Sequence, residues 1–276
     1  MRWTVVCKLL TVYFAKKTTK FYSVGKEEIV SLSSEVDSNL FKGFNPKASP
    51  IPSSSMNVLV IDIGGSNLKL LATGQSERIK IPSGAAFTPE QLYPLVREAT
   101  MAAGWQFEVV SIGFPGVVKD GEIVSDPVNM GKGWKGFDFA AAFGCPVKLI
   151  NDAAMQALGS YSGGKLLFMG FGTGLGTAMV FEHLILPLEG GHLPFRSSTF
   201  EQHVGNAALI EYSKKQWKEW VYQTIEEFRN CFQPDEIVLG GGNSKYLEEL
   251  PANCRLGSNK NALTGGFRLW EQEYTI

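Results

Sequence analysis

Strand-like runs of apolar and β-branched residues begin at Asn57 and recur along the chain. The first four predict strands over residues 57–62, 66–72, 77–82 and 107–113. A later run, "PVKLI", predicts a short buried strand over 146–150. Helical patterns stand between and after these runs, so the alternation predicts an α/β fold.

Three stretches have the apolar spacing and end signals of helices. Residues 88–104 have a Thr-Pro start, a capping-box glutamine and a final glycine, with one unfavourable internal proline. "NDAAMQALGSY" predicts a helix that begins near Asp152. Further on, a helix ending before Pro234 has six large side chains on one face, which we expect in the core: Trp217, Trp220, Val221, Ile225, Phe228 and Phe232.

An internal repeat is the most informative feature of the pattern. Residues 58–71 ("VLVIDIGGSNLKLL") and 165–182 ("KLLFMGFGTGLGTAMVFE") each consist of an apolar strand, a glycine-rich turn and a second strand. Two such hairpins predict a duplicated α/β unit whose two equivalent turns face one ligand. A third glycine cluster, "VLGGGNSK" at 238–245, ends a strand and precedes a predicted helix.

The glycine turns have two interpretations. In the first, Gly64 and Gly65 supply positive φ angles to a tight hairpin and Asp62 caps the turn. In the second, the backbone N–H groups of the turns bind phosphate, since glycine permits close approach. Three glycine clusters, each at the end of an apolar strand, favour phosphate binding.

Composition and charge are those of an ordinary globular chain. It has 276 residues, of which 44% are hydrophobic and 19% charged. The net charge of −1 gives no basic surface for nucleic acid on the body of the protein. The four cysteines, at positions 7, 145, 231 and 254, lack the spacing of a zinc knuckle or a disulfide framework, which predicts a reducing, cytoplasmic location.

The first 55 residues differ from the rest. Residues 1–26 contain six basic side chains and no acidic one, and the apolar stretch 3–15 is too short to span a membrane. An organelle-targeting arm, a weak secretory signal and a simple extension all remain open. Because a proline- and serine-rich segment precedes the first strand, we favour an extension outside the fold over 1–55 and a functional start at Met56.

Seven motifs stand in an order that resembles the ROK family of sugar kinases, and more closely its polyphosphate-glucokinase-like branch. They are DIGGSNLK (62–69), GFPGVV (113–118), NMGKGW (129–134), NDA (151–153), GFGTGLGT (170–177), EGGH (189–192) and LGGGNSK (239–245). The resemblance implies a two-lobed actin/hexokinase-like (RNase H-like) ATPase fold with duplicated mixed-sheet units. It places an N-terminal lobe over 56–152 and a C-terminal lobe over 153–276, whose last helix is a candidate to return to the first lobe.

The resemblance also implies an activity. A ROK kinase of this branch transfers a phosphoryl group from ATP or polyphosphate to the 6-hydroxyl of a hexose, with glucose as the first candidate, and uses Mg²⁺. It implies a homodimer with no nucleic-acid or membrane partner. Two alternatives are a sugar-sensing ROK regulator, disfavoured because residues 1–55 show no helix-turn-helix pattern, and a catalytically silent sugar-binding protein.

On the donor side, the resemblance assigns phosphate contacts to the glycine turns. Asp62 is expected to hold Mg²⁺ through water, and Lys69 to contact phosphate, with a solvated strand residue as the alternative for Lys69. The other expected donor-side residues are Gly64, Gly65 and Ser66 in the first turn, Gly172, Thr173 and Gly174 in the second, and Gly240, Gly241 and Gly242 beside the adenosine.

On the acceptor side, the attacking sugar hydroxyl must lose its proton, so a carboxylate is required. Asp152 is the candidate general base, and its alternative is the N-cap of the helix that follows. The residues expected around the sugar hydroxyls are Asn129, Asn151, Glu189, His192 and Glu201; His192 keeps a structural alternative, and His183 and His203 receive no role.

One feature departs from many ROK members. These members bind a structural zinc through cysteines that follow the EGGH-like segment, whereas residues 193–209 contain no cysteine. We therefore expect no zinc.

Overall fold

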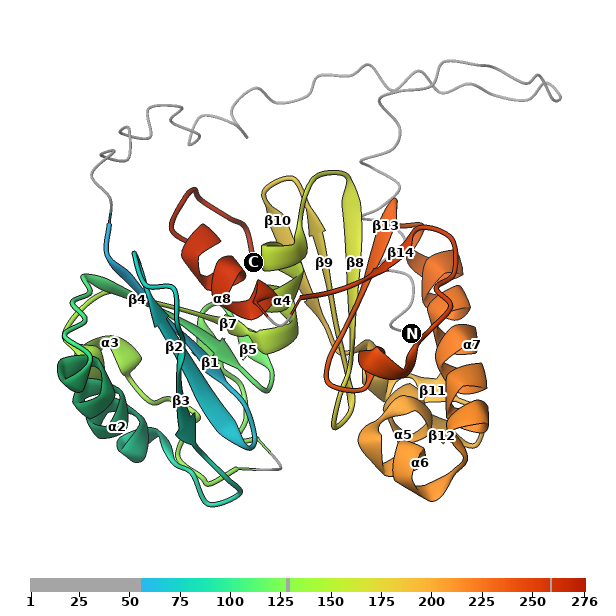
Figure 1. Ribbon diagram of the computed structural model, residues 1–276, viewed down its shortest axis with the longest axis horizontal. Helices are drawn as coiled ribbons and strands as arrows, with labels where there is room; N and C mark the ends of the chain where they lie inside the picture. Colours follow the sequence, from blue (N-terminus) through green and yellow to red (C-terminus); the bar gives the residue numbers. More distant parts are fainter. Residues whose placement is uncertain (1–55, 128–129, 259) are drawn as a thin grey trace, which may run out of the picture. The chain divides into compact units, whose positions relative to one another are not determined.

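The computed structural model describes residues 56–127, 130–258 and 260–276, which belong to one compact unit. This unit is built on two five-stranded mixed sheets (Figure 1). We call the sheet that contains β1, with its helices, the first lobe, and the sheet that contains β8, with its helices, the second lobe. The extension predicted over 1–55 lies outside the described residues.

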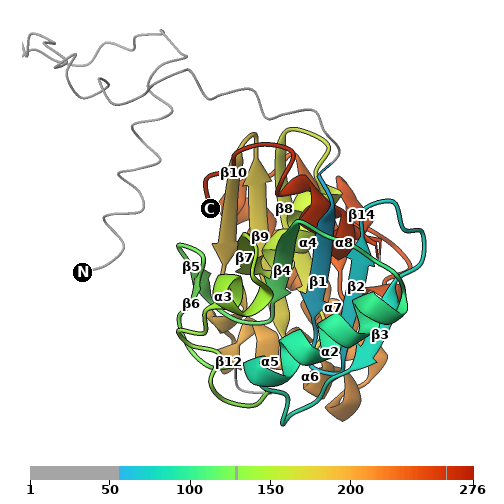
Figure 2. The same ribbon diagram turned by 90° about the vertical axis from the view of Figure 1, so that its left-hand side faces the viewer.

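The sheet of the first lobe has the order β3-β2-β1-β4-β7. β1 pairs antiparallel with β2 and parallel with β4, and β7 extends the parallel part. Helix α2 lies across one face of this sheet (Figure 2). The elements are β1 (Val58–Ile63), β2 (Asn67–Ala72), β3 (Ile79–Pro82), α2 (Pro89–Ala102), β4 (Val109–Phe114), β5 (Val118–Lys119), β6 (Glu122–Ile123), α3 (Phe139–Phe143) and β7 (Val147–Asn151).

The sheet of the second lobe has the order β10-β9-β8-β13-β14. Its elements are β8 (Lys165–Phe171), β9 (Leu175–Phe181), β10 (Leu184–Leu188), η2 (Gly190–His192), β11 (Pro194–Phe195), β12 (Ser198–Thr199), α5 (Phe200–Val204), α6 (Asn206–Glu211), α7 (Lys214–Phe232), β13 (Glu236–Gly240), η3 (Ser244–Tyr246) and β14 (Cys254–Leu256). Helix α4 (Asp152–Ser160) connects the two sheets in the chain, and α8 (Asn261–Arg268) comes last.

The two sheets correspond position for position, which confirms the duplication. β8 pairs antiparallel with β9 and parallel with β13, as β1 does with β2 and β4. Each lobe adds one outer antiparallel strand beside the hairpin and one outer parallel strand on the other side. The turns of the two hairpins, residues 64–66 and 172–174, are therefore equivalent positions of the two units.

Helices α4 and α8 pack against each other and against both sheets. α4 contacts β8 and β9 as well as β4, and α8 contacts β1 and β4 (Figure 1). Close packing requires small residues here: a side chain on Gly266 would collide with Val60 of β1. Ser111 Oγ also donates to Gly266 O at 2.6 Å, which ties β4 to α8.

β1 is buried on both faces because each face has its own cover. Leu59, Ile61 and Ile63 join the core beneath α2, while Val58 and Val60 join the core around α4 and α8. A strand covered on both sides reads as a continuous apolar run, which explains the sequence of residues 58–63. Asp62 stands out as the one charged residue of this strand.

The helix predictions are confirmed with shifted ends. Gln91 Oε1 accepts the Thr88 N–H at 3.0 Å, as the capping box predicted, and α2 continues through Pro94. On α7, Trp217 and Phe228 are buried with their neighbours in the core of the second lobe, and Trp220 and Phe232 pack against it. In the described part of the chain, no helix combines the length and the apolarity that a membrane span needs.

Candidate active site

Asp62 and Lys69 form an ion pair beside the first hairpin. Asp62 is 5% exposed, and the register of β1 and β2 places it opposite Lys69. Lys69 Nζ donates to Asp62 Oδ2 at 2.6 Å, and 35% of the Lys69 side chain remains exposed. Lys69 is therefore not an isolated solvated side chain, because it compensates a carboxylate that would otherwise be buried alone.

Both hairpin turns present backbone N–H groups for which no described atom serves as acceptor. These donors belong to Gly65 and Ser66 in the first turn and to Thr173 and Gly174 in the second. Free N–H groups of this kind are suited to bind an anion, and a Cβ on Gly65 would meet nothing within 4 Å. Gly64 and Gly65 do not have positive φ angles, so the first of the two interpretations of this turn, in which they supply positive φ, is wrong.

The third glycine cluster lies beside the second hairpin. Asn243 N donates to Phe171 O at 2.9 Å, which joins the end of β8 to the segment after β13. Gly241 has a φ of 79° and packs so closely on the Phe171 backbone that a side chain there would collide with it. The helix predicted after this cluster is only the single 3₁₀ turn η3. The glycines expected beside adenosine and those expected at the phosphates are thus neighbours.

Asp152 follows the last residue of β7 and begins α4. Burial raises the pKa of its carboxyl to about 7, and the negative charges of Asp62 and Glu189 act in the same direction. The Ala153 N–H donates to Asp152 Oδ1 at 2.7 Å, and this bond and the charge of Lys69 partly offset the rise in pKa. A carboxyl that titrates near pH 7 is suited to accept a proton under physiological conditions.

Asn151, not Asp152, is the N-cap of α4. Asn151 Oδ1 accepts the Ala154 N–H at 3.1 Å, and Asn151 Nδ2 donates to Gly116 O at 3.1 Å. The alternative in which Asp152 is the N-cap is therefore wrong, because the cap is the preceding residue. The buried Asn151 side chain also joins α4 to the GFPGVV segment. A sugar contact of Asn151 stays a prediction, as does that of Asn129, which lies outside the described residues.

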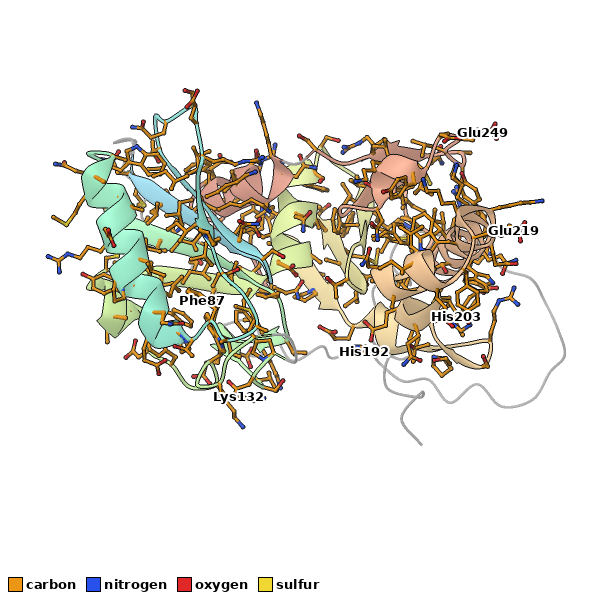
Figure 3. The ribbon with its side chains drawn as sticks, turned by 60° about the horizontal axis from the view of Figure 1, so that its bottom comes forward. Phe87, Lys132, His192, His203, Glu219 and Glu249 are labelled. Carbon is orange, nitrogen blue, oxygen red and sulfur yellow. The ribbon has the colours of Figure 1, made fainter. Side chains whose placement is uncertain are left out.

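The structure brings Glu189, His192 and Glu201 together. His192 Nδ1 is 3.6 Å from Glu189 Oε2, and His192 Nε2 is 3.5 Å from Glu201 Oε1. Burial raises the pKa of Glu189; His192 lowers it, and Glu201 raises it further. His192 is 61% exposed, and Figure 3 shows it on the side of the second lobe nearer to the first, with His203 farther away. This cluster therefore offers several polar groups to a ligand.

The second hairpin contacts this cluster, because a side chain on Gly174 would collide with Glu201. Glu189 also acts on the charge of Asp152, which in turn responds to Asp62. Residues expected at the donor and at the acceptor thus form one connected site, drawn from β1, β2, the start of α4, η2 and α5.

The donor set suits a Mg²⁺ ion that arrives with phosphates. Mg²⁺ prefers oxygen ligands and is often held by one or two carboxylates together with substrate phosphates. Asp62 offers such a carboxylate beside the open turn. Within the described residues, no group of three or more His, Cys, Asp or Glu side chains is arranged to hold a metal ion by itself.

Two residues that the sequence patterns did not single out contact the turns directly. Ser83 Oγ donates to Gly64 O at 2.7 Å, and Asn243 Nδ2 donates to Gly172 O at 3.3 Å. Asn243 lies inside the third glycine motif, but nothing in the motif says which carbonyl its side chain meets. Ser83 lies outside every motif.

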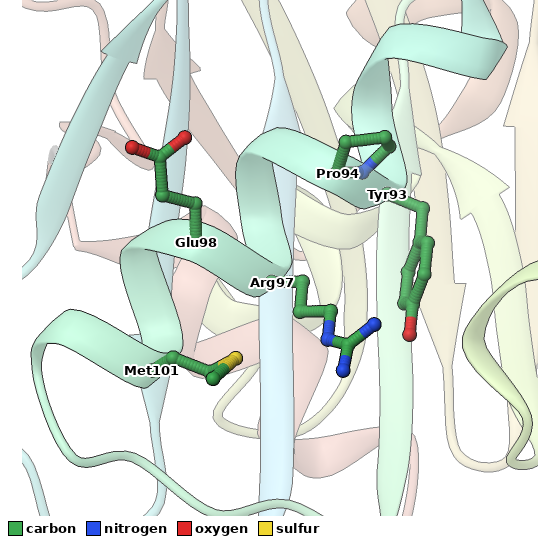
Figure 4. A pocket seen from close by; sticks show the side chains of 5 residues that line it. All are labelled: Tyr93, Pro94, Arg97, Glu98 and Met101. Carbon is green, nitrogen blue, oxygen red and sulfur yellow. The ribbon is translucent and has the colours of Figure 1, made fainter.

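A shallow hollow on α2 stands apart from this site. Figure 4 shows its lining side chains on the helix, and they are Tyr93, Pro94, Arg97, Glu98 and Met101. None of them belongs to the turns or to the strand ends that carry Asp62 and Asp152. We assign it no part in the chemistry.

Comparison with known proteins agrees with this geometry. Residues 58–192 match the model of the ROK family. A polyphosphate glucokinase of Mycobacterium tuberculosis (strain CDC 1551 / Oshkosh) is 28% identical over 210 residues, which cover 68% of this chain and 78% of that protein.

Solved structures show the same fold. The polyphosphate/ATP-glucomannokinase of Arthrobacter sp. strain KM aligns with a TM-score of 0.67 at 24% identity over 76% of this chain and 96% of that one. A ROK family transcriptional regulator, a homolog of the Escherichia coli MLC protein, aligns with a TM-score of 0.60 at 17% identity over 76% of each chain. Matching motifs, duplicated sheets and these relatives lead to one conclusion: the chain has the two-lobed actin/hexokinase-like fold of these structures, and its residues 58–192 are similar to the ROK family.

Proposed function

We propose that the protein is a hexose kinase that transfers a phosphoryl group from ATP or inorganic polyphosphate to the 6-hydroxyl of a sugar, with glucose as the first candidate. The observation that carries the proposal is the placement of Asp152. Its carboxyl titrates near pH 7 and responds to the charges of Asp62 and Glu189. These two carboxylates belong to the proposed donor and acceptor sides, respectively, so Asp152 lies where a proton-accepting group is needed.

In this mechanism Asp152 accepts the proton of the attacking hydroxyl. Glu189, His192 and Glu201 bind other hydroxyls of the sugar and orient it. A pocket that satisfies its polar groups with sugar hydroxyls rejects an analogue that lacks one of them. Asn151 and Asn129 are proposed to complete this set.

On the donor side, the free N–H groups of the two turns stabilise the charge of the transferred phosphoryl group, and positioning supplies most of the catalysis. Lys69 adds a positive charge beside Asp62. Mg²⁺, when bound with the phosphates, neutralises negative charge on the donor. Gly240, Gly241 and Gly242 line the side that takes the adenosine when ATP is the donor.

A ROK regulator is the second candidate, because the aligned transcriptional regulator shares the fold. The two functions differ in turnover, since a regulator binds sugar without phosphorylating it. A homodimer and a cytoplasmic location stay predictions.

The test is a coupled assay that crosses several hexoses with ATP and with polyphosphate, each in the presence of Mg²⁺. We expect phosphorylation of at least one hexose by at least one of the two donors. Sugar binding by calorimetry without turnover from either donor would favour the regulator or the silent sugar-binding protein. Glucose phosphorylation by neither donor would refute the glucokinase assignment.

A further inference from the structure

In each of the two glycine turns, a side chain from another segment donates a hydrogen bond to the carbonyl of the first turn residue. In the first turn, Ser83 Oγ donates to the carbonyl of Gly64 at 2.7 Å. In the second, Asn243 Nδ2 donates to the carbonyl of Gly172 at 3.3 Å. Gly64 and Gly172 are each the first residue after an inner strand, so the two side chains donate to equivalent carbonyls of the duplicated unit.

The two side chains come from unrelated places. Ser83 follows β3 of the first lobe, whereas Asn243 follows β13 of the second lobe. Duplication of the unit does not by itself explain this agreement, because β3 is an outer antiparallel strand and β13 an inner parallel strand. The shared target indicates a shared requirement on the turns.

Peptide geometry shows what that requirement is. A trans peptide is planar, so its C=O and its N–H point in opposite directions. A donor that holds the carbonyl of Gly64 therefore turns the N–H of Gly65 away from Ser83. In the same way, a donor on the carbonyl of Gly172 turns the N–H of Thr173 away from Asn243.

These two N–H groups have no bonded acceptor among the described residues. A Cβ placed on Gly65 or Gly172 would meet nothing within 4 Å, so the space next to them is open. We propose that Ser83 and Asn243 are positioning residues for the phosphoryl donor: each fixes one peptide so that its N–H faces the donor phosphates. The inference rests on the proposed function.

The two carbonyls differ in the number of hydrogen-bond donors that contact them. The carbonyl of Gly172 also accepts the backbone N–H of Asn206 at 2.9 Å. The backbone N–H groups do not distinguish the two contacts, since Ser83 N donates to Ser66 O at 3.0 Å and Asn243 N donates to Phe171 O at 2.9 Å. For the carbonyl of Gly64, the Ser83 hydroxyl is the one donor found among the described residues. Loss of the Ser83 hydroxyl should therefore have the larger effect.

The test uses Ser83→Ala and Asn243→Leu in the full chain. A single hydrogen bond of this kind corresponds to about a 3- to 10-fold change in binding. We expect the KM for ATP or polyphosphate, whichever the parent uses, to rise about 10-fold in Ser83→Ala and about 3-fold in Asn243→Leu. The KM for the sugar should stay within about twofold, because neither side chain contacts the expected sugar residues.

Two control variants remove comparable hydrogen bonds elsewhere. Thr224→Val deletes a buried hydroxyl that donates to Trp220 O at 2.8 Å, and Asn261→Leu deletes a buried amide that donates to Ser160 Oγ at 2.5 Å. Both should lower the melting temperature while leaving the KM for the donor unchanged. They show whether a loss of stability alone is enough to raise that KM.

The inference is overturned if Ser83→Ala and Asn243→Leu lower the melting temperature without raising the KM for the donor. It is also overturned if the KM values for donor and sugar rise by the same factor. Should the parent protein phosphorylate no hexose, the proposed function fails first. Calorimetric binding of tripolyphosphate then decides: weaker binding by Ser83→Ala than by the parent supports the inference, and equal or undetectable binding by both contradicts it.

Discussion

Replacing Asp152 by asparagine should lower activity and raise stability at the same time. Asparagine keeps the shape of the side chain and can still accept the Ala153 N–H, but it cannot take a proton from a sugar hydroxyl. A positioned general base is worth roughly 10²–10⁴ in rate, so we expect kcat to fall by that factor while sugar binding changes by less than about tenfold. The N-cap of α4 is Asn151, which the substitution leaves unchanged, so we expect the cap to be preserved.

The stability effect follows from the raised pKa of Asp152. Burial raises this pKa from an ordinary 3.8 to about 7, so between these values the folded protein binds a proton that the unfolded chain has lost. The free energy of unfolding therefore falls as pH rises through this window. Three pKa units correspond to about 4 kcal/mol, and because the charges of Asp62 and Glu189 are coupled to this carboxyl we expect about 2–4 kcal/mol.

The side-chain amide of the Asp152→Asn variant is neutral at every pH, so the free energy of unfolding of the variant does not contain this decrease with pH. Its stability relative to the parent should grow from pH 4 to pH 7 and then stay constant, measured by urea unfolding of the metal-free proteins. Asp138→Asn is the matched control, because Asp138 is another helix-start carboxylate, accepts the Ala141 N–H at 2.9 Å and lies outside the proposed site. A kcat loss below tenfold, or a stability difference that does not change with pH, would refute the reasoning.

The same geometry gives four further predictions. Gly172→Ala should fold normally yet raise the KM for the donor about tenfold or more, because the new Cβ extends only into the open space proposed for the donor. Gly241→Ala should instead lower the melting temperature, because φ is 79° at this position and the new Cβ would collide with the Phe171 backbone. Equal melting temperatures for the two variants would contradict this reasoning. Lys69→Met should lower kcat with either donor. It should also destabilise the protein by about 3 kcal/mol in urea unfolding, because Asp62 would stay buried without its ion-pair partner. An unchanged free energy of unfolding would show that the ion pair does not contribute to stability. A chain that begins at Met56 should unfold cooperatively with full activity, and loss of that cooperativity would place residues 1–55 in the core. Metal analysis should find no stoichiometric zinc, and one zinc per chain would refute that expectation.

The sequence patterns predicted what depends on local spacing. Strand periodicity located β1 and β2 within about one residue, and the repeated glycine turns identified the duplicated hairpins before their pairing was visible. The amphipathic spacing of α7 correctly assigned its aromatic side chains to the core. In each case the signal lies within a short segment of the chain.

What the patterns missed depends on contacts between distant segments or on dihedral angles. Ser83 reaches Gly64 across 19 positions and Asn243 reaches Gly172 across 71, so no local pattern contains either contact. The interpretation in which Gly64 and Gly65 supply positive φ was wrong, because glycine is common in turns for more than one reason. Asp152 was considered as the cap because asparagine and aspartate are both good caps, and only the structure shows that Asn151 takes that role.

The most direct test of the proposed chemistry is phosphorus NMR of the product formed from glucose with the full-length protein, Mg²⁺ and either ATP or polyphosphate. The proposed function predicts glucose carrying one phosphate on its 6-hydroxyl, formed by the parent and lost in Asp152→Asn. Phosphate on a different hydroxyl would contradict the assigned position of attack, and equal product from parent and variant would contradict the role of Asp152. No sugar phosphate from either donor, in a protein that binds glucose, would contradict the central claim that the site is a glucose kinase.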